Sequence, residues 1–352
     1  MTLDQRLQRL WYGPAWRSLP LWPLAVLFRG IVGVRTFLYR TGVLRTQRVD
    51  VPVVVVGNIT VGGTGKTPVA GWIAHQLALR GRTVAIVLRG YGGSHRGSPR
   101  RVTPEDDPTV VGDEALLHAG RGGCLVVIGA DRVAAARLAV AEGADVVVCD
   151  DGLQHPRLAR DYEIAVVDRT RLLGNRWMLP AGPLRDPAAR LERVHAVLLT
   201  QREANETLPS GRPLDLRNPL QVAARLSIGQ AVNLRNGERR DLASFLQATD
   251  LHALAGIGHP QAFFASLRGA GLAFTSHELR DHGRVEPDRL PFHRNATVLM
   301  TEKDAVKYRA CGLPDWWWVD LEVHIERAAA AMLLASLLER TGLTGAGVRL
   351  GY

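Results

Sequence analysis

Short apolar segments alternate with helix-like segments along most of the chain after residue 51. In the first half each apolar segment is four or five residues long and rich in valine, leucine and isoleucine, as in buried parallel strands. These segments cover residues 53–56, 84–88, 125–128, 146–150, 164–167 and 196–200. Helix-like composition occupies residues 69–79, 114–119 and 132–141 between them. The alternation predicts an α/β fold with a parallel sheet and helices on both faces.

A second α/β unit follows a stretch at residues 208–219 that contains proline, glycine and asparagine. These residues favour turns, so we expect a domain boundary there. Later strand and helix candidates lie at residues 253–257, 261–267, 297–300, 316–319 and 326–338. The sequence therefore predicts an N-terminal segment at 1–45, a first α/β domain at 46–215 and a second, smaller α/β domain at 216–352.

The N-terminal segment is basic and amphipathic. The chain has a net charge of +10, and its first 50 residues hold eight arginines against two aspartates. At about 100° per residue, one helix face without arginine collects Val26, Leu27, Ile31, Val34, Phe37 and Leu38. Trp11, Trp16 and Trp22 add side chains that favour membrane interfaces. The pattern predicts a helix that lies on an anionic membrane surface, and packing on the protein's own core is the alternative.

A membrane-spanning helix is not expected, because the longest uncharged stretch near the N-terminus, residues 18–28, covers 11 residues and a span needs about 20. Hydrophobic residues make up 46% of the chain and charged residues 22%, which excludes a disordered protein. Cys124, Cys149 and Cys311 lack CxxC spacing. We therefore expect a reducing compartment, with neither a disulfide framework nor a zinc site.

A glycine-rich loop follows the first apolar segment and consists of Thr60, Val61, Gly62, Gly63, Thr64, Gly65, Lys66 and Thr67. Glycines there let backbone amides surround phosphates, a lysine reaches the β and γ oxygens, and a threonine hydroxyl reaches Mg²⁺. Lys66 is one of only three lysines among 44 basic residues, which favours a specific need for its ammonium group. The loop predicts a nucleotide site and a P-loop NTPase-like first domain, and a turn without a ligand is the alternative.

Two carboxylates, Asp150 and Asp151, end and follow the apolar segment at 146–150. P-loop enzymes hold Mg²⁺ with an acid at such a position. Parallel strands bring their carboxyl ends to one edge of a sheet, so these aspartates are expected near the loop at 60–67. The alternative is that they form a turn or cap a helix.

Other polar positions have both a functional and a structural interpretation. Asp113 and Glu114 begin a helical segment, where they are either catalytic carboxylates or helix-capping residues. The loop at 89–93 carries Arg89 and Tyr91, which suit either a phosphate contact or a surface hairpin. The other two lysines, Lys303 and Lys307, lie in and after a capping-box pattern at 301–304. His282 is a lone loop histidine, either catalytic or solvent-exposed.

Together these segments resemble the tetraacyldisaccharide 4′-kinases of lipid A biosynthesis. The matching strings are GNITVGGTGKTP at 57–68, RGYGG at 89–93, GDE at 112–114, DDGLQH at 150–155, LPAGPLR at 179–185 and TEKDAVK at 301–307. The resemblance runs in this order from about residue 10 to 340. DDGLQH and LPAGPLR are highly specific, and in this family the phosphate loop begins with serine or threonine, as at Thr60.

The resemblance implies transfer of the γ-phosphoryl group of ATP, with Mg²⁺, to the 4′-hydroxyl of tetraacyldisaccharide 1-phosphate. By motif, Asp113 is the catalytic base and His282 the histidine that orients it. The implied metal ligands are Thr67, Glu114, Asp150 and Asp151, and the implied substrate contacts are Arg89, Tyr91, Gln154, His155 and Arg185. The chain departs from the family pattern around His282 and after the LPAGPLR string. Gly283 follows His282 where a second histidine is usual, Leu279 and Val285 stand where aromatic residues are usual, and Asp186 replaces a glutamate.

The implied partners are an acylated glucosamine disaccharide phospholipid and the cytoplasmic face of the Gram-negative inner membrane. We expect a monomer and no nucleic-acid partner. One alternative is a membrane-attached switch ATPase, whose loop normally has an additional lysine where Val61 stands. Another is a GTP-binding regulator, which needs an Asn-Lys-x-Asp motif that the three lysines do not form.

Overall fold

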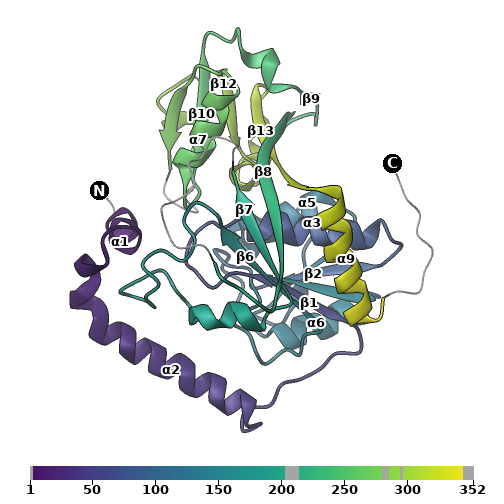
Figure 1. Cartoon of the computed structure of the whole chain (residues 1–352). Coiled ribbons are helices and arrows are strands. Elements are labelled where there is room, and N and C mark those ends of the chain that lie inside the picture. Colours follow the sequence, from purple (N-terminus) through teal and green to yellow (C-terminus); the bar gives the residue numbers. More distant parts are fainter. Residues whose placement is uncertain (1–2, 203–213, 280–282, 284, 294–295, 344–352) are drawn as a thin grey trace.

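The computed structural model of the 352-residue chain describes residues 3–202, 214–279, 283, 285–293 and 296–343. Among these residues, thirteen strands form one continuous sheet that passes through two α/β units (Figure 1). The strand order is β11-β10-β12-β13-β8-β7-β6-β1-β5-β2-β4-β3, and β9 pairs with β8. The fold is therefore the expected α/β class, with a mostly parallel sheet.

The first unit contains the strands expected from the short apolar segments. They are β1 (Val53–Gly57), β2 (Val84–Leu88), β4 (Leu125–Ile128), β5 (Val146–Asp150), β6 (Tyr162–Asp168) and β7 (Ala196–Gln201), all parallel, with β3 (Arg100–Arg101) antiparallel at the edge. β1 lies between β5 and β6, and Val56 pairs with Asp150. The end of β1 is therefore beside the end of β5, as the sequence predicts.

Helices cover both faces of this part of the sheet, and its strands are therefore buried on both sides. One face packs on α3 (Lys66–Ala78), α5 (Asp113–Arg121) and α9 (Arg327–Thr341), and the other on α6 (Arg132–Ala141). Alternate residues of β1 point to opposite faces, so Val54 and Val56 join the first core and Val53 and Val55 the second. The short α4 (Pro108–Val111) precedes α5.

The second unit continues the sheet beyond β7. Its elements are β10 (Leu251–Ala255), α7 (Pro260–Gly269), β11 (Thr275–Glu278), β12 (Thr297–Thr301), α8 (Glu302–Ala305) and β13 (Trp316–Ile325). The 14-residue β8 (Leu220–Asn233) pairs with β7 on one side and β13 on the other, so it is shared by both units, and β9 (Arg239–Arg240) pairs with it. Its alternating burial has the two-residue period of a strand with one exposed face.

The last helix, α9, returns to the first unit (Figure 1). Leu333 and Leu337 join the core that also contains Val54 and Ile164. Residues 326–338 therefore pack on the first unit although they follow the second in sequence. The boundaries 1–45, 46–215 and 216–352 stay a prediction.

The N-terminal residues form α1 (Leu3–Trp11), a 3₁₀ segment (Ala15–Leu21) and α2 (Trp22–Arg40), which runs along the outside of the first unit (Figure 1). Phe28 and Val32 pack against the core. Leu27, Ile31 and Val34 are about 60% exposed, at 62%, 59% and 60%. Most of the apolar face expected from the sequence is thus open to the surroundings.

One expectation about this segment is wrong. Trp11 is no membrane anchor, because it is 7% exposed and its indole Nε1 donates to the Pro180 carbonyl at 2.9 Å. Residues Ala15–Arg40 form a 26-residue helical stretch that contains an 18-residue window with a mean hydropathy of 1.5, which is long and apolar enough to cross a membrane by length and composition alone. Arginines interrupt the uncharged run in this segment, but its mean hydropathy remains apolar. Whether this segment spans a membrane or lies on its surface stays a prediction.

Candidate functional site

The glycine-rich loop between β1 and α3 forms a cradle at the amino end of α3. Gly62 and Gly65 have φ angles of 117° and 84°, which glycine adopts readily and other residues rarely do. Lys66 and Thr67 are the first residues of α3, so the unpaired amides and positive dipole end of that helix face the loop. Asn58 Nδ2 donates to Thr64 Oγ1 at 3.0 Å and holds the loop closed. This arrangement suits an anionic phosphate chain.

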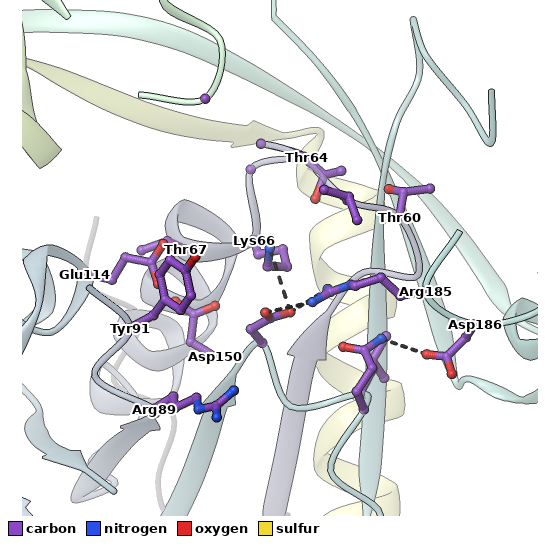
Figure 2. Close-up of a pocket in the computed structure, with 18 of the residues that line it drawn as sticks. Thr60, Thr64, Lys66, Thr67, Arg89, Tyr91, Glu114, Asp150, Arg185 and Asp186 are labelled. Atoms are coloured by element: carbon purple, nitrogen blue, oxygen red, sulfur yellow. Dashed lines mark hydrogen bonds and ion pairs between the residues drawn. The ribbon is translucent and has the colours of Figure 1, made fainter. Parts of the chain in front are cut away.

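Two cations from different parts of the chain meet at Asp151. Lys66 Nζ lies 3.7 Å from Asp151 Oδ1, and Arg185 donates to both oxygens of that carboxylate at 2.7 and 3.0 Å. Figure 2 shows Lys66 and Arg185 pointing toward this carboxylate. Arg185 also binds the side chain and carbonyl of Asn58. The LPAGPLR string therefore fixes the end of β1 and the Asp150-Asp151 pair to each other.

These contacts set the charge of Asp151. Burial by itself would raise the pKa of this carboxyl, but the hydrogen bonds from Arg185 and the charge of Lys66 outweigh it and lower the pKa to about 2. Asp151 also has a φ of 55°, in the left-handed region where aspartate and asparagine are tolerated better than most residues. The side chain is therefore ionised at any physiological pH and presents a fixed negative charge to Lys66.

We expect Asp151→Asn to alter the pH dependence of stability. The folded pKa of about 2 lies below the ordinary value of 3.8, so ionised Asp151 stabilises the fold above about pH 4. That contribution is lost as the pH falls toward about 2. The wild type should exceed the variant in urea midpoint at pH 7, and the difference should shrink between pH 4 and pH 2. A difference that stays constant down to pH 2 would contradict this assignment.

Asp150 is more deeply buried than its neighbour. Its Oδ2 contacts Nε2 of His118 on α5 at 3.1 Å, and its buried Oδ1 has no hydrogen-bond partner among the described residues. Asp150 and Thr67 line the same cavity. The described residues hold no group of three or more histidine, cysteine, aspartate or glutamate side chains arranged around one point. One buried carboxylate oxygen and one hydroxyl nevertheless fit Mg²⁺, which usually takes one or two protein ligands besides phosphates and water.

The acidic pair at the start of α5 faces the two remaining lysines, from the second unit. Lys307 Nζ lies 3.4 Å from Asp113 Oδ2, and Lys303 Nζ lies 3.6 Å from Glu114 Oε1. Glu114 lines the cavity, whereas Asp113 is buried and is not among the described lining residues. Each lysine of the chain thus lies within 4 Å of a carboxylate of the candidate site.

The surroundings of Lys307 keep it charged. Burial by itself would lower the pKa of this ammonium, but the negative charges of Asp304 and Asp113 outweigh burial and raise it. Lys307 also donates to the Gly283 carbonyl at 3.2 Å. The predicted His282 lies outside the described residues.

The predicted substrate contacts all line the cavity, but several are already engaged. Gln154 Nε2 donates to Asp186 Oδ2 at 2.7 Å and to the Asn58 carbonyl at 2.9 Å. Burial and the charge of Arg132 lower the pKa of His155 to about 4, so this imidazole is neutral at pH 7. Arg89 and Tyr91 line the cavity, where Figure 2 shows them on the same side as Glu114, and Tyr91 is 63% exposed.

The cavity has a volume of about 2840 Å³ and extends from the glycine-rich loop to the second unit and to α2. Pockets for ordinary small ligands measure about 300–1,000 Å³, so this one has room for a nucleotide and a second, larger molecule. Apolar lining comes from α2 and the second unit, and includes Phe28, Ile31, Ile228, Ile257 and Phe263. Arginines line other parts of its wall. The cavity suits a ligand with both anionic and apolar parts.

Sequence reasoning missed several residues that shape the site. His118 carries no motif, and only the packing of α5 beside β5 brings it to Asp150. Arg121 makes two hydrogen bonds to Glu302 across the units, one of them at 2.9 Å from Nε. The asparagine before the loop, Asn58, was visible in the matching string, but its bonds to Thr64 and Arg185 follow from the fold alone.

Comparisons with known proteins agree on one family. The model of the family described as tetraacyldisaccharide-1-P 4′-kinase matches residues 17–338. The tetraacyldisaccharide 4′-kinase of Alkalilimnicola ehrlichii is 46% identical over 337 residues, covering 94% of this chain and 96% of that protein. The enzyme of the same name from Pseudomonas paraeruginosa is 43% identical over 338 residues, covering 96% and 98%. The solved structure of LpxK from Aquifex aeolicus in complex with ATP is 26% identical, with a TM-score of 0.76 over 92% of this chain and 99% of that one.

Proposed function

The chain belongs to the tetraacyldisaccharide 4′-kinase family, and from that premise we propose how its own residues perform the reaction. It is an ATP-dependent lipid kinase that transfers the γ-phosphoryl group to the 4′-hydroxyl of tetraacyldisaccharide 1-phosphate and forms lipid IVA. The observation that carries the proposed mechanism is the cradle at the start of α3, where Lys66 and three glycines border the cavity.

The phosphate chain of ATP binds in this cradle. Amides of residues 62–67 and the amino end of α3 surround the β and γ phosphates, and Lys66 leaves Asp151 to contact their oxygens. The 3.7 Å separation of that ion pair is long enough for the lysine to exchange partners at small cost. When Lys66 moves away, Arg185 still balances the negative charge of Asp151, because it donates to both carboxylate oxygens.

Asp150 and Thr67 are the residues that would hold Mg²⁺, with Asp151 and Glu114 next to them. The orphaned Asp150 Oδ1 supports this choice, because an anionic oxygen that is buried without a partner is costly unless a cation binds it. His118 fixes the other oxygen and so orients the carboxylate. Bound Mg²⁺ would neutralise charge that develops on the phosphates.

Asp113 acts as the general base. The 4′-oxygen attacks the γ phosphorus, the bond from that phosphorus to the β–γ bridging oxygen breaks, and ADP leaves with that electron pair. The hydroxyl proton passes to Asp113. Lys307 supports this role, because its Nζ lies 3.4 Å from Asp113 Oδ2 and holds this buried carboxylate in one orientation. The part expected of His282 stays a prediction.

The lipid enters the cavity from the side of α2, with the enzyme at the cytoplasmic face of the inner membrane. The substrate keeps its acyl chains in the bilayer, so its sugars must reach an active site held at the membrane surface. The exposed apolar side chains of α2, exposed Trp16 and Trp22, and the cavity-lining Phe28 and Ile31 support this route. A monomer remains our expectation.

We expect the triple variant Leu27→Glu, Ile31→Glu, Val34→Glu to lose at least about tenfold in binding to anionic phospholipid vesicles, because three exposed apolar contacts with lipid are replaced by charge. Vesicle sedimentation measures this. Deleting residues 1–40 is less suitable, since Trp11, Phe28 and Val32 contact the body of the protein.

A matched control places three glutamates at Leu79, Leu246 and Met332, which are 46%, 47% and 60% exposed elsewhere on the molecule. It should bind vesicles as the wild type does. Equal loss in both triple variants would show that added negative charge alone is responsible, and undiminished binding of the α2 variant would remove α2 as the membrane contact.

The proposed function is tested with purified protein, ATP, Mg²⁺ and the detergent-dispersed disaccharide lipid 1-phosphate. The expected product is the 1,4′-bis-phosphorylated lipid together with one ADP per lipid. ATP turnover that does not depend on the lipid and leaves no phosphate on it would refute the assignment.

A further inference from the structure

Lys307 sits at a junction of the two units without facing the cavity. Its side chain is 3% exposed, and it is not among the described residues that line the cavity, unlike Lys303. Three acceptors surround Nζ: Asp304 Oδ1 at 2.9 Å, the Gly283 carbonyl at 3.2 Å and Asp113 Oδ2 at 3.4 Å. An ammonium group has three N–H donors, so all three are used within the protein. Lys307 therefore has no donor left for a phosphate or a sugar.

The position of Lys307 is set by its own unit. Asp304 is 0% exposed, and its Oδ2 accepts from the Gly256 amide at 2.9 Å and from the Thr301 hydroxyl at 2.6 Å. Thr301 ends β12 and Gly256 follows β10, so the carboxylate is tied to two neighbouring strands. Asp304 Oδ1 in turn accepts a hydrogen bond from Lys307, which lies three residues later in the chain. The ammonium is thus a fixed point of the second unit.

The position of Asp113 is set by the first unit. Gly112 has a φ of 90°, and a Cβ there would lie 2.4 Å from the Tyr91 carbonyl, so the loop at 89–93 presses directly against the start of α5. This contact fixes where α5 begins and hence where Asp113 lies. Two other ion pairs, Lys303 with Glu114 and Arg121 with Glu302, join α8 to α5 beside it. The Asp113–Lys307 pair is therefore the deepest of three links between the same two helical segments.

We infer that Lys307 is a positioning residue for phosphoryl transfer: held by Asp304 and the Gly283 carbonyl of the second unit, it orients the Asp113 carboxylate of the first. The inference rests on the proposed role of Asp113 as the base.

The test compares Lys307→Met and Lys307→Arg with the wild type for lipid phosphorylation, affinity for a non-hydrolysable ATP analogue, and thermal stability. We expect Lys307→Met to lower kcat by about 10²-fold, within the range for misplacing a general base, while the Kd of the analogue changes less than about threefold. Lys307→Arg keeps the charge but spreads its donors over a larger planar group, so its kcat should lie between the other two. Arg101→Met removes a surface ion pair with Glu142 and should leave all three quantities unchanged.

The outcomes separate the inference from the proposed function. Absence of lipid phosphorylation by the wild type would count against the function itself. A folded Lys307→Met protein with the wild-type kcat would overturn the inference alone, and so would a fall in kcat matched by an equal loss of analogue affinity, which indicates a purely structural role. If Lys307→Met does not fold, Lys307→Arg decides: a reduced kcat with normal analogue affinity supports the inference, and a wild-type kcat overturns it.

Discussion

Lys66→Ala should lower kcat/KM for lipid phosphorylation by about 10³-fold or more, because cationic groups that hold the transferred phosphoryl group contribute on that scale. Lys66 is the one lysine at the start of α3, where amides and the helix dipole already favour anions. Arg185, the other cation at Asp151, cannot readily take over its role because it is engaged with Asp151 and Asn58. A coupled assay for ADP and direct detection of the phosphorylated lipid both measure this loss.

The folded state should tolerate this change. Lys66 is partly exposed, and its contact to Asp151 is long at 3.7 Å, so the thermal midpoint of Lys66→Ala should stay close to that of the wild type. The matched control is Arg239→Ala, which also removes a cation from a pair with an aspartate, at 2.8 Å from Asp320, and lies outside the described cavity lining; it should keep full activity. Activity of Lys66→Ala within tenfold of the wild type would mean that the phosphates do not bind at this loop.

Asp113→Asn should lower kcat by about 10²- to 10⁴-fold, the usual contribution of a positioned general base. The amide has nearly the same shape as the carboxylate but cannot take up the proton of the 4′-hydroxyl. Affinity for an ATP analogue should change little, because in this proposal Asp113 meets the sugar hydroxyl, whereas residues 62–67 hold the phosphates. The measurement is kcat under saturating ATP and lipid, together with the Kd of the analogue.

The control for Asp113→Asn is Glu142→Gln, which neutralises an acid on the surface near Arg101. It should retain full activity. If Asp113→Asn also retained activity, the neighbouring Glu114, which does line the cavity, would become the better candidate for the base. Loss of ATP affinity together with activity would instead indicate that Asp113 acts through the shape of the nucleotide site.

Much of the first unit could be predicted because its strands are short, mostly apolar and in large part separated by helices. The segments at 84–88, 125–128 and 146–150 match β2, β4 and β5 at both ends. Their carboxyl ends share one edge of the sheet, which is why Asp150 and the loop at 60–67 were expected side by side and lie so. Parallel topology turns a sequence pattern into a spatial prediction here.

The remaining features depend on contacts between distant segments. β8 escaped prediction because one of its faces is exposed, so polar residues alternate with apolar ones along it. The sequence predicts a membrane-interface position for Trp11, but its indole donates a hydrogen bond to the carbonyl of Pro180, 169 positions away. The pairing of Asp113 with Lys307 joins two separate units. Local sequence patterns do not indicate contacts between distant segments. The rarity of lysine in the chain, in contrast, singled out all three lysines of the site.

The most direct measurement of the proposed site is a crystal structure with a non-hydrolysable ATP analogue and Mg²⁺. The proposal requires the β and γ phosphates within hydrogen-bond distance of Lys66 and the amides of residues 62–67, and Mg²⁺ bound by Asp150 or Thr67. The terminal phosphate would face the side of the cavity bordered by α5. An analogue bound elsewhere in the cavity, with Lys66 still paired to Asp151, would contradict it.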